Sequence, residues 1–277
     1  MTDALIPGAE AWSHEGAEPV GVLVIHGFTG NPSSMRGMAE ACAAAGLHVE
    51  LPRLPGHGTT VDDMLATSWV DWAGEAEAAY QRLAARVPKV VVAGLSMGGA
   101  LTLRVGADHP EVLGLVCVNP ATQPQPPEVV AMVQGMLDAG TEVIPGIGSD
   151  IADPEVKESA YEGTPVRCLL SLVNDGLAPL AEHYPSITMP LLLLTSPNDH
   201  VVEPAQADYL QAKQRIYAPG AVCVVNRDDL LSRPGATLPR PASAEPTPQP
   251  TNRAERAERR AAERAARVAS AADAARC

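Results

Sequence analysis

A serine flanked by glycines is the clearest sign of chemistry in this chain of 277 residues. The segment Gly94-Leu95-Ser96-Met97-Gly98 has the G-x-S-x-G pattern of a nucleophile elbow, a sharp strand-to-helix turn that lifts a serine hydroxyl above a sheet. Glycines are needed on both sides because side chains there would collide in the tight turn. The pattern directly follows the apolar run Lys89–Ala93 and precedes a helical pattern that reaches about Asp108. This context predicts that Ser96 is a nucleophile.

A second turn, His26-Gly27-Phe28, follows another apolar run and could stabilise the negative charge that such a reaction creates. An attacked ester carbonyl becomes an oxyanion, and each backbone N–H group held ready for it lowers the barrier by about 3 kcal/mol. The expected donors of this oxyanion hole are the backbone N–H groups of Phe28 and Met97. We interpret His26 as a structural residue that orders the loop, in preference to a catalytic one.

The order of the elements predicts an α/β protein with a mainly parallel sheet flanked by helices. Runs of β-branched and aliphatic residues are typical of strands buried on both faces. They occur at Pro19–Ile25, Leu47–Leu51, Lys89–Ala93, Val112–Val118 and Pro190–Leu194. Helical patterns cover residues 33–46 and 61–86 and the segment after Ser96. Strands that alternate with helices indicate parallel pairing with right-handed crossovers.

Four sequence blocks carry a resemblance to a known family. They read VLVIHGFTGNPSSM, LPRLPGHG, VVVAGLSMGGALTL and PLLLLTSPNDHVVEP, and they occur in the family's order over about residues 15–210. Together they resemble the bacterial carboxylesterase and monoacylglycerol lipase group of the α/β-hydrolase superfamily. The resemblance implies the α/β-hydrolase fold with a small cap over an apolar acyl pocket. It also implies a serine esterase that needs no cofactor and no metal and acts on short or medium acyl esters.

The resemblance assigns two members of a Ser-Asp-His triad and leaves the third open. Ser96 matches the nucleophile, and Asp199, in the loop after the last of the predicted strands, matches the acid that orients the imidazole. In the family a histidine follows the acid by about thirty residues, in the chain order Ser, Asp, His. This chain has no histidine after His200. His200 is next to the acid and His57 lies in a Gly-His-Gly loop, so neither is an obvious replacement.

The sequence predicts a hydrolase domain over residues 1–212 and an atypical tail over residues 213–277. Within the domain, residues 119–188 are proline-rich and acidic with weak helical patterns, which predicts a cap inserted over the carboxyl edge of the sheet. The tail is rich in Pro, Arg and Ala and has no evident final strand, histidine loop or closing helix, so the C-terminal part of the fold is expected to be missing. The alternatives are a reading-frame change or gene-model error, and a genuine disordered extension.

The charge of the chain argues against nucleic acid as its main partner. The net charge is −13, and it is near −18 for residues 1–210 and near +5 for residues 211–277, whereas phosphate binding requires a basic face. Five widely spaced cysteines without a CxxC pair predict reduced thiols in the cytoplasm. No signal-peptide pattern and no run of about 18 apolar residues occurs, so no integral membrane segment is expected.

Two classes of function follow from these observations. The first is a serine hydrolase that cleaves carboxylic esters, including monoacylglycerols, through an acyl-Ser96 intermediate. The alternative is a catalytically inactive relative that binds a small apolar ligand or a partner, because the usual histidine is absent. A hydroxyl nucleophile points to acyl transfer and away from the dehalogenases and epoxide hydrolases of this fold, which would have Asp at position 96. The physiological substrate, the preferred acyl length and the oligomeric state are not predicted.

Overall fold

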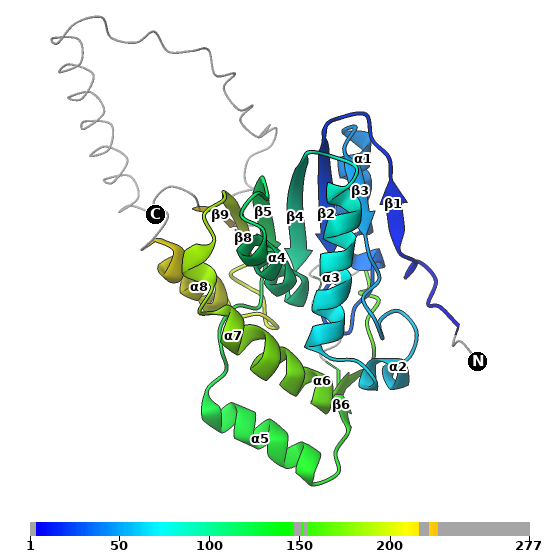
Figure 1. The fold of residues 1–277 in the computed structure, drawn as a ribbon. Coiled ribbons are helices and arrows are strands. Elements are labelled where there is room, and N and C mark those ends of the chain that lie inside the picture. The colour runs from blue at the N-terminus through cyan, green and yellow to red at the C-terminus, as the bar shows by residue number, and fades with distance from the viewer. Residues whose placement is uncertain (1–3, 147–150, 152–154, 216–221, 227–277) are drawn as a thin grey trace, which may run out of the picture. The chain divides into compact units, whose positions relative to one another are not determined.

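A seven-stranded sheet forms the centre of the protein in the computed structural model, which describes residues 4–146, 151, 155–215 and 222–226 (Figure 1). Its strand order is β1-β3-β2-β4-β5-β8-β9, and every neighbouring pair is parallel except β1 with β3. The strands are β1 (Trp12–His14), β2 (Val20–Ile25), β3 (His48–Leu51), β4 (Lys89–Leu95), β5 (Gly114–Val118), β8 (Leu191–Thr195) and β9 (Val222–Asn226). The predicted mainly parallel α/β sheet is thereby confirmed.

Strand β2 shows how the sheet is buried on both faces. Its alternate residues Leu23 and Ile25 belong to one buried apolar cluster, and Val22 and Val24 belong to another. The first cluster lies against α3 (Trp69–Ala84), α4 (Met97–Asp108) and α8 (Ala205–Arg215), and the second lies against α1 (Ser33–Ala44). Side chains that alternate along a strand face opposite sides of a sheet, so a continuous apolar run fits a strand covered on both sides.

The single helix predicted over residues 61–86 is wrong, because the structure has two helices there. The first, α2 (Val61–Leu65), begins after Thr60, whose hydroxyl accepts a hydrogen bond from the Asp63 N–H at 3.2 Å. The second, α3, begins after Ser68, whose backbone N–H donates to Asp71 Oδ2 at 2.9 Å. Such capping interactions satisfy N–H groups that a new helix leaves unpaired, and they fix the break.

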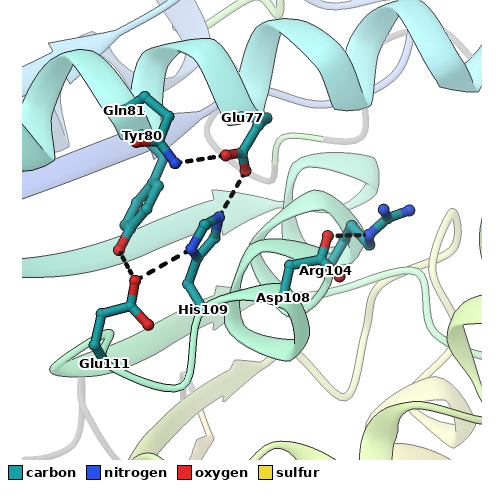
Figure 2. Close-up of polar contacts among 7 residues, drawn as sticks. All are labelled: Glu77, Tyr80, Gln81, Arg104, Asp108, His109 and Glu111. Atoms are coloured by element: carbon teal, nitrogen blue, oxygen red, sulfur yellow. Dashed lines mark hydrogen bonds and ion pairs between the residues drawn. The ribbon is translucent and has the colours of Figure 1, made fainter.

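A charged cluster ties α3 to the end of α4 on the outside of the molecule (Figure 2). The ring of His109 lies between two carboxylates, with Nε2 at 2.8 Å from Glu77 Oε2 and Nδ1 at 3.2 Å from Glu111 Oε1. The same ring packs against that of Tyr80, with centroids 4.1 Å apart, and the Tyr80 hydroxyl donates to Glu111 at 2.9 Å. The cluster cross-links elements more than thirty positions apart, which is a structural role.

The segment between β5 and β8 forms a small subdomain next to the sheet (Figure 1). It contains α5 (Pro127–Asp138), β6 (Val143–Pro145), β7 (Gly163–Pro165), α6 (Val166–Ser171), the π-helix η1 (Leu172–Leu177), α7 (Ala178–Leu180) and the 3₁₀ helix η2 (Tyr184–Ser186). None of the residues of α5 is fully buried, whereas most residues of α6 and half of those of η1 are buried. This segment corresponds to the region predicted as a cap.

The expectation that no final strand follows residue 213 is wrong. Strand β9 pairs with β8 in parallel, from Leu191 opposite Val222 to Thr195 opposite Asn226. Helix α8 also crosses the predicted boundary at residue 212. Residues 227–277, where a histidine loop would follow in the resembled family and where most of the predicted tail lies, are outside the described part of the chain.

Candidate active site

Ser96 lies at a strained turn between the end of β4 and the start of α4. Its φ of 54° and ψ of −116° are values that residues with a side chain rarely adopt. A Cβ atom at Gly94 would come within 2.1 Å of the Gly98 carbonyl oxygen, and one at Gly98 would come within 2.3 Å of the Ile25 carbonyl oxygen. Both flanking glycines are therefore required by close backbone approach. The geometry is that of a nucleophile elbow.

The loop after β2 passes directly beside Ser96. A Cβ atom built at Gly27 would lie 3.5 Å from Ser96 Cβ. Within the described part of the chain, the backbone N–H groups of Phe28 and Met97 donate to no protein acceptor. Two unpaired donors beside a serine hydroxyl could bind an oxyanion that develops there.

His26 holds this loop from inside the protein. Its Nδ1 is 3.0 Å from the Gly27 carbonyl oxygen, and its Nε2 accepts the Leu54 N–H at 3.1 Å. Burial, assisted by neighbouring His57, lowers the pKa of His26 to about 3. A neutral imidazole has one donor and one acceptor nitrogen, and both are used here. His26 is thus a structural cross-link between two loops.

His57 is also buried and neutral. Burial lowers its pKa to about 4, its Nδ1 lies 2.9 Å from the Pro55 carbonyl oxygen, and its Nε2 is buried without a partner. Its ring makes edge contacts with those of His26 and Trp72, at centroid distances of 5.1 and 5.6 Å. Trp72 in turn packs edge-on against Phe28 at 5.7 Å. These rings form a buried support behind the loop.

Asp199 lines a cavity together with Ser96. Its Oδ1 accepts the backbone N–H groups of Val201 at 2.9 Å and Val202 at 2.7 Å, which fixes the carboxylate in its loop. Asn119, at the end of β5, connects this loop to the elbow. Its side-chain Oδ1 accepts the Ser196 N–H at 2.9 Å, and the preceding residue, Val118, accepts the Ser96 N–H at 3.0 Å.

Two cavities meet at Ser96. One, of about 270 Å³, has an apolar wall formed by α5, α6 and η1, including Val129, Val133, Leu172 and Leu177. The other, of about 380 Å³, is lined by more polar groups, among them those of residues 157–159 together with Ser33 and Ser34. An apolar chain and a polar group could therefore be held on either side of the serine hydroxyl.

None of the seven histidines, all of which lie in the described residues, lines either of these cavities. The structure brings Ser96, Asp199 and the Phe28 loop together but adds no imidazole to them. His200, next to Asp199, has an exposed side chain.

Two residues of the site were not predicted from the sequence. Asn119 has a positive φ of 38° and joins the ends of β5 and β8. Gln206, in α8, lines the apolar cavity, and its Oε1 accepts the N–H groups of Thr122 and Gln123 at 2.8 and 2.7 Å. Both roles depend on contacts between residues about 80 positions apart in the sequence, so no local pattern predicts them. The one local hint is that Asn119 directly follows a predicted strand.

The chain is similar in sequence to known proteins. The family model described as "Serine aminopeptidase, S33" matches residues 18–218. The chain is 43% identical over 208 residues to the thermostable monoacylglycerol lipase of Bacillus sp. (strain H-257), covering 74% of this chain and 80% of that protein. It is 27% identical over 192 residues to a carboxylesterase of Bacillus subtilis (strain 168), covering 68% and 76%.

A solved structure gives the same picture. The match comes from work on LipS and LipT, two metagenome-derived lipolytic enzymes, and has a TM-score of 0.74 at 36% identity. It covers 83% of this chain and 96% of that one. Among the described residues, no helix is both long and apolar enough to cross a membrane.

Proposed function

The chain belongs to the family described as Serine aminopeptidase, S33, an α/β-hydrolase family, and from this premise we propose that its site is built to cleave short or medium acyl esters, including monoacylglycerols, through an acyl-Ser96 intermediate once a general base completes it. The observation that carries the proposal is the position of Ser96, at a strained elbow where an apolar and a more polar cavity meet. Ester hydrolysis is the reaction named for both curated relatives.

The two cavities suggest how a substrate is oriented. The acyl chain would lie in the apolar cavity, where burial of each CH₂ group stabilises the complex by about 0.8 kcal/mol. The alcohol would lie in the more polar one. This arrangement directs the ester carbonyl toward Ser96 Oγ.

The proposed chemistry begins with attack by the Ser96 hydroxyl on that carbonyl. The Phe28 and Met97 N–H groups would stabilise the resulting oxyanion, and they need no rearrangement to do so because they are unpaired. Asp199 would orient the general base and stabilise its cation. The base must take the serine proton and then protonate the leaving alkoxide, which makes it indispensable.

The absence of that base supports a second candidate, an inactive relative that binds an apolar ligand. No histidine of this chain lines the cavities at Ser96, and neither His26 nor His57 is placed to exchange protons, since both are buried and neutral. A serine hydrolase that has lost its histidine is slowed roughly a millionfold. We therefore expect the chain with this sequence to be nearly inert.

A chimera separates the two candidates. Residues after Asn226 would be replaced by the segment that follows the corresponding strand in the Bacillus sp. H-257 monoacylglycerol lipase, a 43% identical relative. The native chain, the chimera and each with Ser96→Ala would be exposed to a fluorophosphonate probe and to p-nitrophenyl butyrate. The proposed function expects labelling and chelator-insensitive turnover only in the chimera that retains Ser96.

Three other outcomes are informative. A soluble chimera that binds acyl ligands without being labelled would favour the inactive relative. Labelling of the native chain at Ser96 would show that another residue acts as base. Turnover that survives Ser96→Ala would contradict the assignment of the nucleophile.

We also propose a cytoplasmic location with reduced thiols. Cys42, Cys117 and Cys168 are free, and burial raises the pKa of the Cys117 thiol above its usual range and that of Cys168 to about 11. Thiols of this kind are unreactive structural residues. Alkylation of the protein unfolded in urea, before and after reduction, would test this, since disulfide-bonded thiols would react only after reduction.

A further inference from the structure

One wall of the apolar cavity is a helix with a rare hydrogen-bonding pattern. Elements α6, η1 and α7 follow one another without a break over residues 166–180, and the junction residues Leu172 and Ala178 keep helical dihedral angles (Figure 1). The middle element is a π-helix, in which each turn contains an extra residue. Such insertions are uncommon and frequently accompany functional sites.

The π-helix supplies part of the cavity wall. Leu169 and Leu177 both line the cavity although they are eight positions apart. In a regular α-helix of 3.6 residues per turn, eight positions exceed two turns by about 80°. The wider turns of η1 rotate the chain less per residue and bring Leu177 back to the side of Leu169.

Gly176 seats this π-helix on α3. A Cβ atom at Gly176 would come within 2.7 Å of Cδ2 and 2.8 Å of Cε3 of the Trp69 ring. Trp69 is the first residue of α3 and is 3% exposed, so its ring cannot move into solvent freely. The backbone of η1 therefore lies directly on the indole, at a distance that only glycine allows.

Polar contacts hold the same face of the helix. The Trp69 backbone N–H donates to Ser171 Oγ at 3.1 Å, and the Ser171 hydroxyl donates to Asp175 Oδ2 at 2.7 Å. One turn earlier, the Cys168 thiol donates to the Met64 carbonyl oxygen at 3.1 Å. The helix is thus anchored to α2 and α3 on one side while Leu172 and Leu177 line the cavity.

We propose that Gly176 is a specificity-determining residue, because its contact with Trp69 fixes the position of the cavity wall and so the length of acyl chain that fits. This inference rests on the proposed function, in which that cavity holds the acyl group. It concerns binding and is independent of the missing base.

The test measures binding without turnover. Neutral n-alkanols of four to fourteen carbons would displace the apolar dye N-phenyl-1-naphthylamine from the full chain. In the native protein, affinity should rise about fourfold for each added CH₂ group until the cavity is full, and then level off. With Gly176→Ala the chain length at this plateau should shift by at least two carbons.

Gly74→Ala is the matched control. Gly74 is an exposed helical glycine of α3 whose added Cβ would meet nothing within 4 Å, so the plateau should not move. Adding Trp69→Leu to Gly176→Ala removes the ring that the new methyl group meets, and it should return the plateau toward the native length. If Gly176→Ala does not fold, Ser171→Ala replaces it. This substitution removes the hydrogen bonds of Ser171 to Trp69 and Asp175 without a steric clash, and it should also shift the plateau.

Several results would overturn the inference. They are an unchanged plateau in a cooperatively folded Gly176→Ala variant, an equal shift in Gly74→Ala, or no saturable binding of alkanols to the native chain. If Ser171→Ala is used in place of Gly176→Ala, an unchanged plateau in Ser171→Ala would likewise overturn the inference. Failure of Ser96 labelling in the chimera leaves these measurements unaffected, so the two proposals fail separately.

Discussion

Relief of the backbone strain at Ser96 should stabilise the protein when the residue becomes glycine. A residue held in so sparsely populated a region costs about 1–3 kcal/mol of folding free energy. Glycine removes that cost, but it lowers the stability by about 0.5–1 kcal/mol because it gives the unfolded chain more conformational freedom. Comparing Ser96→Gly with Ser96→Ala isolates the backbone effect, because both variants lack the hydroxyl. Taking the middle of each range, we expect Ser96→Gly to be the more stable by about 1 kcal/mol.

The measurement is equilibrium unfolding in urea, supported by calorimetry. For a domain of this size, each kcal/mol corresponds to about 2–4 °C in Tm, so the two variants should differ by several degrees. Ala131→Gly, at an exposed position of α5, gives the ordinary cost of glycine in a helix and should lower stability by about 1 kcal/mol. If Ser96→Gly is no more stable than Ser96→Ala, the turn stores no strain and the reasoning fails.

Four further predictions concern the rest of the molecule. Burial lowers the pKa of His57 to about 4, from about 6.5 in the unfolded chain. Below pH 6.5 the unfolded chain therefore binds a proton that the folded protein does not. The free energy of unfolding is thus unaffected by this residue above about pH 6.5 and falls as the pH is lowered toward about 4. Between pH 7 and 4, the free energy of unfolding should therefore fall by about 3 kcal/mol less in His57→Gln than in the native protein, as measured by urea unfolding at each pH. His109→Phe keeps a ring against Tyr80 but removes both carboxylate contacts, and it should lower the free energy of unfolding in urea by about 1 kcal/mol. Gly98→Ala should prevent folding or reduce stability by several kcal/mol, because its methyl group meets fixed backbone, whereas Gly135→Ala, with open space around it, should gain about 0.5–1 kcal/mol. Amide hydrogen exchange should be faster in α5 than in α6, because only α6 has buried residues, and equal protection would contradict this.

The elbow could be predicted from sequence because its determinants are local. The apolar strand, the two glycines and the helix that follow one another around Ser96 lie within twenty residues. The break between α2 and α3 also had a local signal, since Ser68 and Asp71 form a capping pair. The continuous helical periodicity around them concealed it.

The rest of the site depends on contacts that no local pattern reveals. The roles of Asn119 and Gln206 arise where distant segments meet. Strand β1 has only three residues, too few to show a period, and it forms because β3 pairs with it. Strand β9 was missed although Val222–Asn226 contains three valines, because the unusual composition of the following residues obscured a short β-branched run.

The strand order also implies a sequence of events during biosynthesis. The part of the sheet that carries the elbow, from β1 to β5, has been translated once residue 118 is reached, and β8 and β9 then join its edge in chain order. The backbone partners of Ser96, which are the Val118 carbonyl oxygen and the Ala121 N–H, are therefore translated before the Asp199 loop. Alterations near the 3′ end of the coding sequence would then reach only the last strand of the sheet, and they would leave intact the residues that build the turn at Ser96, beside which a different C-terminal segment could pair with β8.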